Sequence, residues 1–355
     1  MPRPMPIVPL SEMTDHQEAD LFALMTSKQE LTTRDGKPYF KVAFRDARRE
    51  VSFPVWADSA WAVDCRDAWT PGTFYKIRAT YRETTYGPQL DIRKIREVTE
   101  ADAADGFDPA MCLARSRFDP STMYDELVEL VRTHVADGSL RGLVESILST
   151  NHDLFLTAPA ARHNHHAYVG GLLEHTLNVT RTCVFLAGQY AEYVPEMDPP
   201  LDTGLVVAGG ALHDIGKLRE LDAGPAETRY TAEGELIGHL LLGRDMVREA
   251  AAEIGFVGET LLRLEHLILS HQRLPEWGSP KPPMTPEALL VHYADDIDAK
   301  YHIMTRILAD DTTPGVMTSR KNILHQKVFR GLGVGDWGLG TCCRAIDGAG
   351  CGLLG

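Results

Sequence analysis

The spacing of apolar residues changes once along this chain, and that change constrains the fold more than any other feature. From residue 17 to about residue 99, apolar and polar side chains alternate in short runs separated by turn residues, which is typical of antiparallel strands. Beyond about residue 119, apolar residues recur at intervals of three and four, which is typical of helices. We therefore predict a multidomain α+β chain with a small β-domain followed by a nearly all-α domain.

The first region contains five runs that read as strands. They are DLFALMTSKQELTT, KPYFKVAFRD, REVSFPVWAD, FYKIRATYRE and YGPQLDIRKIREV, and SAWAVDCRDAW reads as a short helix between the third and the fourth. Five strands with a helix at that place follow the order of an OB-fold. We expect residues 17–99 to form a five-stranded OB-like β-barrel that binds nucleic acid.

One face of the second run suggests how such a barrel would bind a single strand. Tyr39, Lys41 and Arg45 alternate with apolar residues and so share a face, and Trp56 ends the neighbouring run. Aromatic rings stack on bases of any sequence, while Lys and Arg contact the phosphates. These four residues are predicted to bind substrate, with burial of the aromatic rings in the barrel core as the alternative.

The remaining segments divide the chain further. Residues 1–16 are broken by prolines and are expected to be a disordered tail, and the Ala/Asp-rich residues 100–118 are expected to be a linker. Residues 119–330 form the predicted helical domain. The Gly-rich, aperiodic residues 331–355 are expected to be a second tail.

Composition excludes several classes of protein. A net charge of -14 argues against strong nonspecific binding to duplex nucleic acid, which depends on Lys and Arg neutralising phosphates. The longest apolar runs fall short of the roughly 20 residues that cross a bilayer, and the N-terminus lacks the apolar core of a signal peptide. The 6 cysteines form no CxxC pair. We expect a soluble cytoplasmic protein with reduced thiols and no membrane partner, and a homo-oligomer is compatible with the sequence.

Histidines and aspartates interrupt the apolar helical runs at several places. The motifs are HTL at His175, HDIGK starting at His213, GHL at His239, SHQ at His271 and HYADDIDAK around Asp295. An unpaired imidazole or carboxylate costs several kcal/mol to bury, so many of them in one core need a shared partner. A divalent metal ion fits, since imidazole and carboxylate bind Mn, Fe, Co, Ni, Zn or Mg.

The HDIGK motif places two candidate ligands side by side. His213 and Asp214 cannot face one direction on a regular helix, but they can at a helix end, which Gly216 would permit. We therefore expect the preceding helix to stop near His213.

These motifs resemble a known family. GGLLEHTL, HDIGK and ADDID stand in the order expected of the HD superfamily of phosphohydrolases. NHHAYVGGLLEHTL, GSPKPPMTPEALLVHYADDIDAK and an OB-like domain placed before the HD domain resemble the YhaM-type 3′-to-5′ exoribonucleases over roughly residues 17–320. The resemblance implies a divalent ion such as Mn and removal of nucleotides from the 3′ end of single-stranded RNA, and often DNA.

The resemblance also implies a ligand set. The first ion would be bound by His175, His213, Asp214 and Asp295. Asp214 would bridge to a second ion completed by His239 and His271, for which hydrogen-bonded core histidines are the alternative. Gln272 stands where relatives commonly carry a second histidine, and because Gln is a poor ligand for a transition metal, a one-metal enzyme remains an alternative.

The chemistry follows from such a centre. Water beside the ions would have a lowered pKa, so that it ionises near neutral pH and attacks a phosphorus whose oxygens the ions polarise. Asp214 is therefore a predicted catalytic residue. Lys217 could neutralise charge on the phosphate, or could instead meet a helix dipole. His165 and His166, just before the first ligand helix, are predicted to contact substrate phosphate, with capping of that helix as the alternative. Asp298 could orient a ligand or pair with Lys300.

Three functions compete at this stage. The first is a metal-dependent 3′-to-5′ exonuclease on single strands. The second is an HD-type phosphodiesterase or phosphohydrolase acting on a cyclic dinucleotide or nucleotide, although the GYP tripeptide of one such branch is absent after His271 and a small substrate would not need the first domain. The third is a noncatalytic single-strand-binding protein, which the intact ligand set disfavours.

Overall fold

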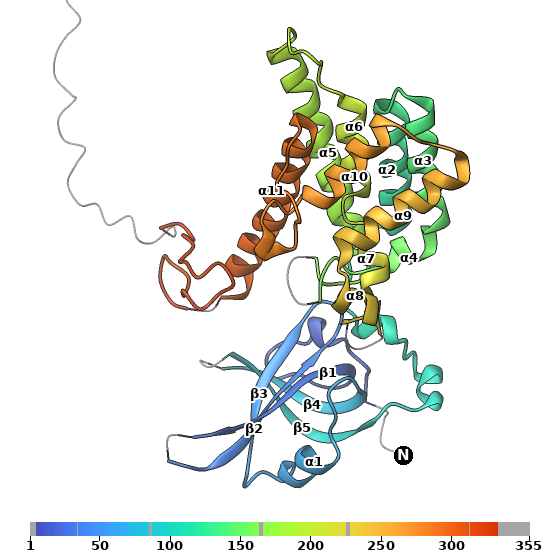
Figure 1. Cartoon of the computed structure of the whole chain (residues 1–355). Coiled ribbons are helices and arrows are strands. Elements are labelled where there is room, and N and C mark those ends of the chain that lie inside the picture. The colour runs from blue at the N-terminus through green and yellow to red at the C-terminus, as the bar shows by residue number, and fades with distance from the viewer. Residues whose placement is uncertain are drawn as a thin grey trace, which may run out of the picture. The chain divides into compact units, whose positions relative to one another are not determined.

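The structure is a computed structural model that describes residues 5–33, 35–84, 87–162, 166–224, 228–311 and 313–332. The chain divides into two compact units, Met1–Lys300 and Tyr301–Gly355. The first unit contains a five-stranded antiparallel sheet followed by a helical domain, as predicted from the change in apolar spacing (Figure 1). The predicted multidomain α+β fold class is thereby confirmed.

The sheet has the strand order of the predicted OB-fold. Its elements are β1 (Glu18–Thr32), β2 (Pro38–Arg45), β3 (Glu50–Trp56), α1 (Ala62–Asp67), β4 (Phe74–Thr84) and β5 (Gly87–Glu97). The strands pair in the order β3-β2-β1-β4-β5, and β3 also contacts β5, so the sheet curls toward a barrel with α1 between the third and fourth strands. Side chains of β3 and β4 alternate between buried and more exposed, because one face packs on the core.

Two segments expected to lack structure pack against this sheet instead. In the N-terminal segment, a short 3-10 helix η1 (Leu10–Glu12) buries Leu10 completely, and Met13 is buried with it. The expected disordered tail is therefore wrong for residues 5–16, because two apolar anchors among the prolines enter the barrel core.

The expected linker also folds. It contains 3-10 helices η2 (Glu100–Asp105) and η3 (Pro109–Cys112). Buried Asp102 pairs with Lys76 and Arg96 of the sheet, and Cys112 is buried with apolar residues of β1. The ion pairs of Asp102 and the burial of Cys112 fix this segment against the sheet, although its composition is typical of a linker.

The helical domain is nearly all α, as predicted, and it also contains two short helices that were not predicted, at His152–Thr157 and Lys217–Glu220. Its elements are α2 (Pro120–His134), α3 (Gly138–Thr150), α4 (His152–Thr157), α5 (Gly171–Tyr193), α6 (Thr203–Leu212), α7 (Lys217–Glu220), α8 (Ala232–Leu236), α9 (His239–Ile254), α10 (Glu259–Ser270), the 3-10 turn η4 (Pro275–Trp277) and α11 (Pro286–Asp310). Their apolar faces form one core. A short hairpin, β6 (Leu221–Ala223) with β7 (Thr228–Tyr230), was not predicted.

Two breaks in the helical pattern determine where the candidate ligands lie. The run GELIGHLLLGRDMVREAAAEI divides into α8 and α9 at Gly238, whose φ of 81° ends the first helix and places His239 at the start of the second. As expected, α6 ends just before His213. Gly216 has a right-handed φ of -63° and directly precedes the short helix α7. Glycine is required there because a Cβ would lie 2.0 Å from the His239 carbonyl oxygen.

The second unit is small. Within it, Met317 bridges to Phe329, and the Arg330 guanidinium pairs with Asp311. The predicted helical domain, residues 119–330, therefore crosses a boundary at Lys300, and most of the predicted Gly-rich tail lies outside the described residues. A bilayer-spanning helix is not found in the described part of the chain, since none there combines the necessary length and hydropathy.

Candidate metal centre

Candidate ligands come together from five separate segments of the helical domain. His175 lies in the second turn of α5, His213 and Asp214 directly follow α6, His239 begins α9, His271 follows α10, and Asp295 lies in α11. All but His239 and Asp295 are at most 2% exposed. Segments up to 120 residues apart in sequence thus place their polar atoms in one interior.

A first cluster forms around His175. Its Nε2 atom lies 3.2 Å from His213 Nε2, 3.4 Å from Asp214 Oδ2 and 3.2 Å from Asp295 Oδ1. His213 Nε2 is 3.4 Å from the same Asp214 oxygen and 3.9 Å from the same Asp295 oxygen. Ligands held about 2.0 to 2.2 Å from one ion lie roughly 3 to 3.6 Å apart, so this spacing fits a shared cation.

The tautomers of the two histidines test whether a cation belongs there. His175 Nδ1 donates to Asp298 Oδ2 at 2.7 Å, and His213 Nδ1 donates to the Gly210 carbonyl at 2.8 Å. With both Nδ1 atoms protonated, the neutral rings direct two Nε2 lone pairs at each other across 3.2 Å. Facing lone pairs and two carboxylates need a positive charge between them, which a proton on His175 supplies in part and a divalent ion supplies fully, so the donor set fits such an ion.

A second cluster shares Asp214 with the first. Asp214 Oδ1 lies 3.5 Å from His239 Nε2 and 3.5 Å from His271 Nε2. His239 Nδ1 donates to Glu220 and His271 Nδ1 donates to the Ile268 carbonyl, so both Nε2 atoms are acceptors in the neutral rings. Asp214 Oδ1 and His271 Nε2 are buried without a hydrogen-bond partner among the described residues. Such buried polar atoms need an explanation, and a second cation supplies one.

Gln272 lies at the edge of this second cluster. Its side-chain amide donates to His239 Nε2 at 3.0 Å. The amide therefore competes for the lone pair that a second ion would use, so the second cluster is the weaker candidate of the two.

Lys217 is part of the same interior. Its ammonium, on a side chain that is 9% exposed, donates to Asp214 Oδ2 at 2.6 Å. Burial alone would lower the pKa of Lys217, but Asp214 raises it, so the ammonium stays charged. Burial would raise the pKa of Asp214, yet Lys217 and His213 hold it well below its usual range. The centre thus keeps an ionised carboxylate deep in the domain.

His165 and His166, the two histidines before α5, were predicted to contact substrate phosphate. His166 is only 2% exposed and donates from Nε2 to Asp298, so its position does not support the predicted contact with substrate phosphate. His165 lies outside the described residues. Asp298 orients His175, the first of its two predicted roles, while Lys300 pairs with Asp296. Glu220, which holds His239, was missed, although it stands three residues after Lys217 in HDIGKLRE.

Comparisons with known proteins agree with this geometry. The HD domain model matches residues 172–300, which include all six candidate ligands. A helicase model, TraI_2, matches residues 118–196. The 3′-5′ exoribonuclease YhaM of Bacillus subtilis is 31% identical over 88% of this chain and 94% of its own length. That of Halalkalibacterium halodurans is 31% identical over 87% and 91%. The chain belongs to the YhaM family.

Among solved structures, one similar protein is the second OB-fold domain of replication protein A from Methanococcus maripaludis. It is 13% identical, covers 26% of this chain and 96% of its own, and has a TM-score of 0.21. In this member of the YhaM family, the OB-fold is instead recognised from its own strand order and the α1 position.

The predicted binding face of that OB-fold is largely assembled. Tyr39 pairs with Trp56 across β2 and β3, and their rings lie 5.0 Å apart. Trp56 is 48% exposed, and Lys41 is exposed on the same face two residues from Tyr39. Tyr39 and Arg45 are both half-buried, and the Arg45 Nε is enclosed without a hydrogen-bond partner among the described residues, so Arg45 stands apart from the other three.

Metal affinity in this YhaM-family chain should depend on pH through His175. Burial alone would lower the pKa of His175, but Asp214, Asp295 and Asp298 raise it well above 6.5. That proton stabilises the metal-free fold at low pH and is lost as the pH rises through the raised pKa. A divalent ion must displace it, so we expect the association constant for Mn to rise about tenfold per pH unit until the pKa is passed.

Isothermal titration of Mn at about pH 6, 7 and 8 would measure this dependence. The carboxylates do not contribute in this range, because the pKa values of Asp214 and Asp295 are held below their usual range. An affinity independent of pH would show that no proton is displaced and would contradict the raised pKa.

Proposed function

We propose that this chain is a metal-dependent 3′-to-5′ exonuclease that hydrolyses phosphodiester bonds of single-stranded RNA, with DNA as a second substrate and Mn as the preferred ion. The observation that carries the proposal is the meeting of two imidazole lone pairs and two carboxylates around one point in a YhaM-family HD domain. The described cysteines are free thiols, which supports a cytoplasmic location.

The ligands follow from the two clusters. We assign the first ion to His175, His213, Asp214 and Asp295, and a more weakly held second ion to Asp214, His239 and His271. Bound divalent ions would supply Lewis acidity that polarises a phosphoryl oxygen and lowers the pKa of water.

Other side chains would orient the ligands and bind the substrate. Asp298 and the Gly210 carbonyl hold the Nδ1 protons of His175 and His213, which keeps each Nε2 free to bind. Lys217 holds its proton on Nζ, orients Asp214 and keeps a positive charge beside the site where a phosphate would develop negative charge. The exposed Trp56 and Lys41, with the half-buried Tyr39, would bind the strand by stacking and charge.

An oligonucleotide assay tests the proposal. A single-stranded RNA labelled at its 5′ end is incubated with the protein and Mn, and the expected product is a ladder that shortens from the 3′ end while keeping the label. The same RNA annealed to its complement serves as the control. Hydrolysis of cyclic dinucleotides with the oligonucleotide left intact would favour the small-substrate alternative instead.

The family relationship favours the polymer over the other two functions. The curated relatives named as exoribonucleases match across 87% or 88% of this chain, so the likeness includes the OB-fold as well as the HD domain. A noncatalytic binder would have no need for the complete buried donor set.

The OB-fold contact leads to a prediction of its own. Changing Trp56 and Lys41 to Ala together should raise KM for a long oligonucleotide about tenfold, because stacking contributes roughly 1 to 3 kcal/mol per base. The kcat should stay unchanged, since neither residue belongs to the metal centre. Arg132→Ala, which removes an exposed cation from α2, is the matched control and should leave KM unchanged. An unaltered KM in the double variant would show that this face does not bind the strand.

A further inference from the structure

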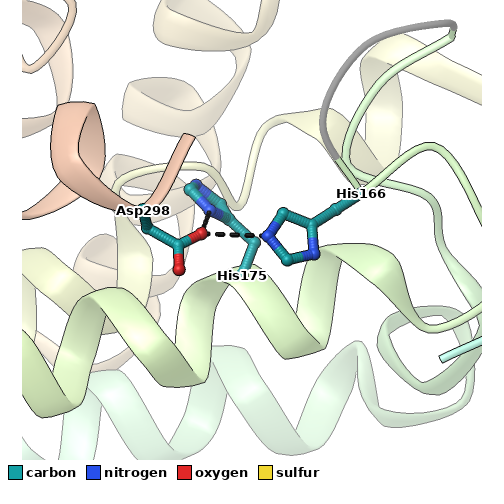
Figure 2. A group of neighbouring side chains, drawn as sticks. All are labelled: His166, His175 and Asp298. Atoms are coloured by element: carbon teal, nitrogen blue, oxygen red, sulfur yellow. Dashed lines mark hydrogen bonds and ion pairs between the residues drawn. The ribbon is translucent and has the colours of Figure 1, made fainter. Parts of the chain in front are cut away.

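A set of hydrogen bonds lies behind His175, on the side away from the proposed first ion. Asp298 Oδ2 accepts from His175 Nδ1 at 2.7 Å and from His166 Nε2 at 3.0 Å. Figure 2 shows the Asp298 carboxylate between the two rings, with one oxygen bonded to both. The two nitrogens of an imidazole point in divergent directions, so Asp298 is not a ligand of the ion that His175 Nε2 would bind.

The backbone holds His166 in an uncommon conformation. Its φ of 51° is left-handed, which a residue with a Cβ rarely adopts, and its side chain is 2% exposed. Its carbonyl oxygen accepts from Ala160 N at 3.0 Å, and a Cβ on Gly171 would lie 2.0 Å from that oxygen. A strained residue that the surrounding structure fixes so closely suggests a functional requirement for its side chain.

Hydrogen bonds continue beyond His166. Its Nδ1 lies 2.8 Å from the Tyr168 hydroxyl, which donates to Glu174 at 2.9 Å. Glu174 immediately precedes His175 on α5. The chain of bonds therefore begins and ends on the same helical turn, and it fixes the His166 ring at both nitrogens.

We infer that His166 and Asp298 form a positioning pair for His175, in which Asp298 fixes the ring of the ligand and His166 fixes Asp298. Asp298 determines which nitrogen of His175 carries the proton and how the ring is turned. His166 holds the same carboxylate oxygen from the opposite side and so limits its rotation. This inference rests on the proposed function, because it assigns the pair a role only if His175 binds a metal ion.

Mn binding by the full-length protein tests the pair. Asp298→Asn should weaken Mn binding about 10- to 100-fold in isothermal titration, as loss of a group that orients a metal-binding histidine does. His166→Asn should weaken it about tenfold, and Asn is chosen because it tolerates a left-handed φ. Asp296→Asn on the same helix, whose partner is the exposed Lys300, is the control and should bind Mn as the wild type does.

The double variant separates a shared role from independent ones. If His166 acts through Asp298, the double variant should bind Mn no more weakly than Asp298→Asn alone. Excess Mn should restore kcat, Asp298→Glu should recover part of the affinity, and the melting temperature of the metal-free protein should stay unchanged. A merely structural role would lower that melting temperature and would not be rescued by metal.

Other outcomes would overturn the inference. Unchanged Mn affinity in Asp298→Asn, or additive losses in the double variant, would contradict the pair, and a raised KM for RNA with normal Mn affinity would place His166 on substrate instead. If one of the other variants fails to fold, the Mn affinity of Asp298→Glu alone is the test, and it should be lower than that of the wild type. A wild-type protein without Mn binding or nuclease activity would refute the proposed function, whereas active wild type with unaffected variants refutes only the pair.

Discussion

Asp214→Asn should lower the rate of RNA shortening on the order of 10³-fold and weaken Mn binding at both clusters. Asp214 is the only residue among the six candidate ligands whose two oxygens face different histidines, Oδ2 toward His175 and His213 and Oδ1 toward His239 and His271. A neutral amide supplies no negative charge to either cluster. It also leaves the buried Lys217 ammonium without the negative charge that now lies 2.6 Å away.

The comparison for this variant is Asp296→Asn. Asp296 is next to Asp295 in α11 but pairs with the exposed Lys300, so its loss should leave the rate within about twofold of wild type. Both variants are assayed on 5′-labelled RNA at saturating Mn, after circular dichroism has confirmed a folded helical domain. Asp214→Asn with near wild-type activity would falsify the proposed centre.

Removing metal should lower the thermal stability of the helical domain strongly. Without a metal ion, the Nε2 atoms of His175 and His213 still meet the carboxylates of Asp214 and Asp295 inside the domain, and a proton on His175 replaces only part of the ion's charge. An ion bound with a Kd near 1 µM and supplied at about 1 mM stabilises the fold by about 4 kcal/mol. For a domain of about 200 residues, this corresponds to a rise in melting temperature of roughly 10 °C.

Differential scanning calorimetry with Mn and with EDTA measures that rise. Mg and Ca at the same concentration serve as controls, because a site with several imidazole ligands favours transition metals over these oxygen-preferring ions. Asp214→Asn should lose most of the Mn-dependent shift. A melting temperature that is the same with Mn and with EDTA would mean that the donors are satisfied without an ion.

Periodicity was sufficient to predict the long helices that carry most of the centre, but not the break at Gly238 that places His239 at the start of α9. Alternation in β1 to β5 and three-and-four spacing in the helices both arise because one face of each element is buried. The local order of apolar and polar residues is enough to show this. The stop of α6 before His213 was predicted too. The hairpin of β6 and β7 was missed because strands of three residues contain too few alternations to be recognised.

Contacts between distant segments could not be predicted in the same way. Gly216 was expected to permit a helix end, but what requires glycine there is a close approach to α9 that no local pattern reveals. Leu10 and Asp102 were assigned to unstructured segments because only the folded sheet provides their apolar and basic partners. His166 was predicted to contact substrate phosphate because the sequence does not show that Asp298, 132 residues later, lies beside it.

Because Asp295 lies in α11, it is the last of the six candidate ligands to be synthesised. His175, His213, Asp214, His239 and His271 all leave the ribosome before it. A nascent chain that ends before α11 therefore contains both histidines of the first cluster but lacks one of its two carboxylates. The first cluster, and the cleavage that depends on it, would then be complete only after α11 has been made.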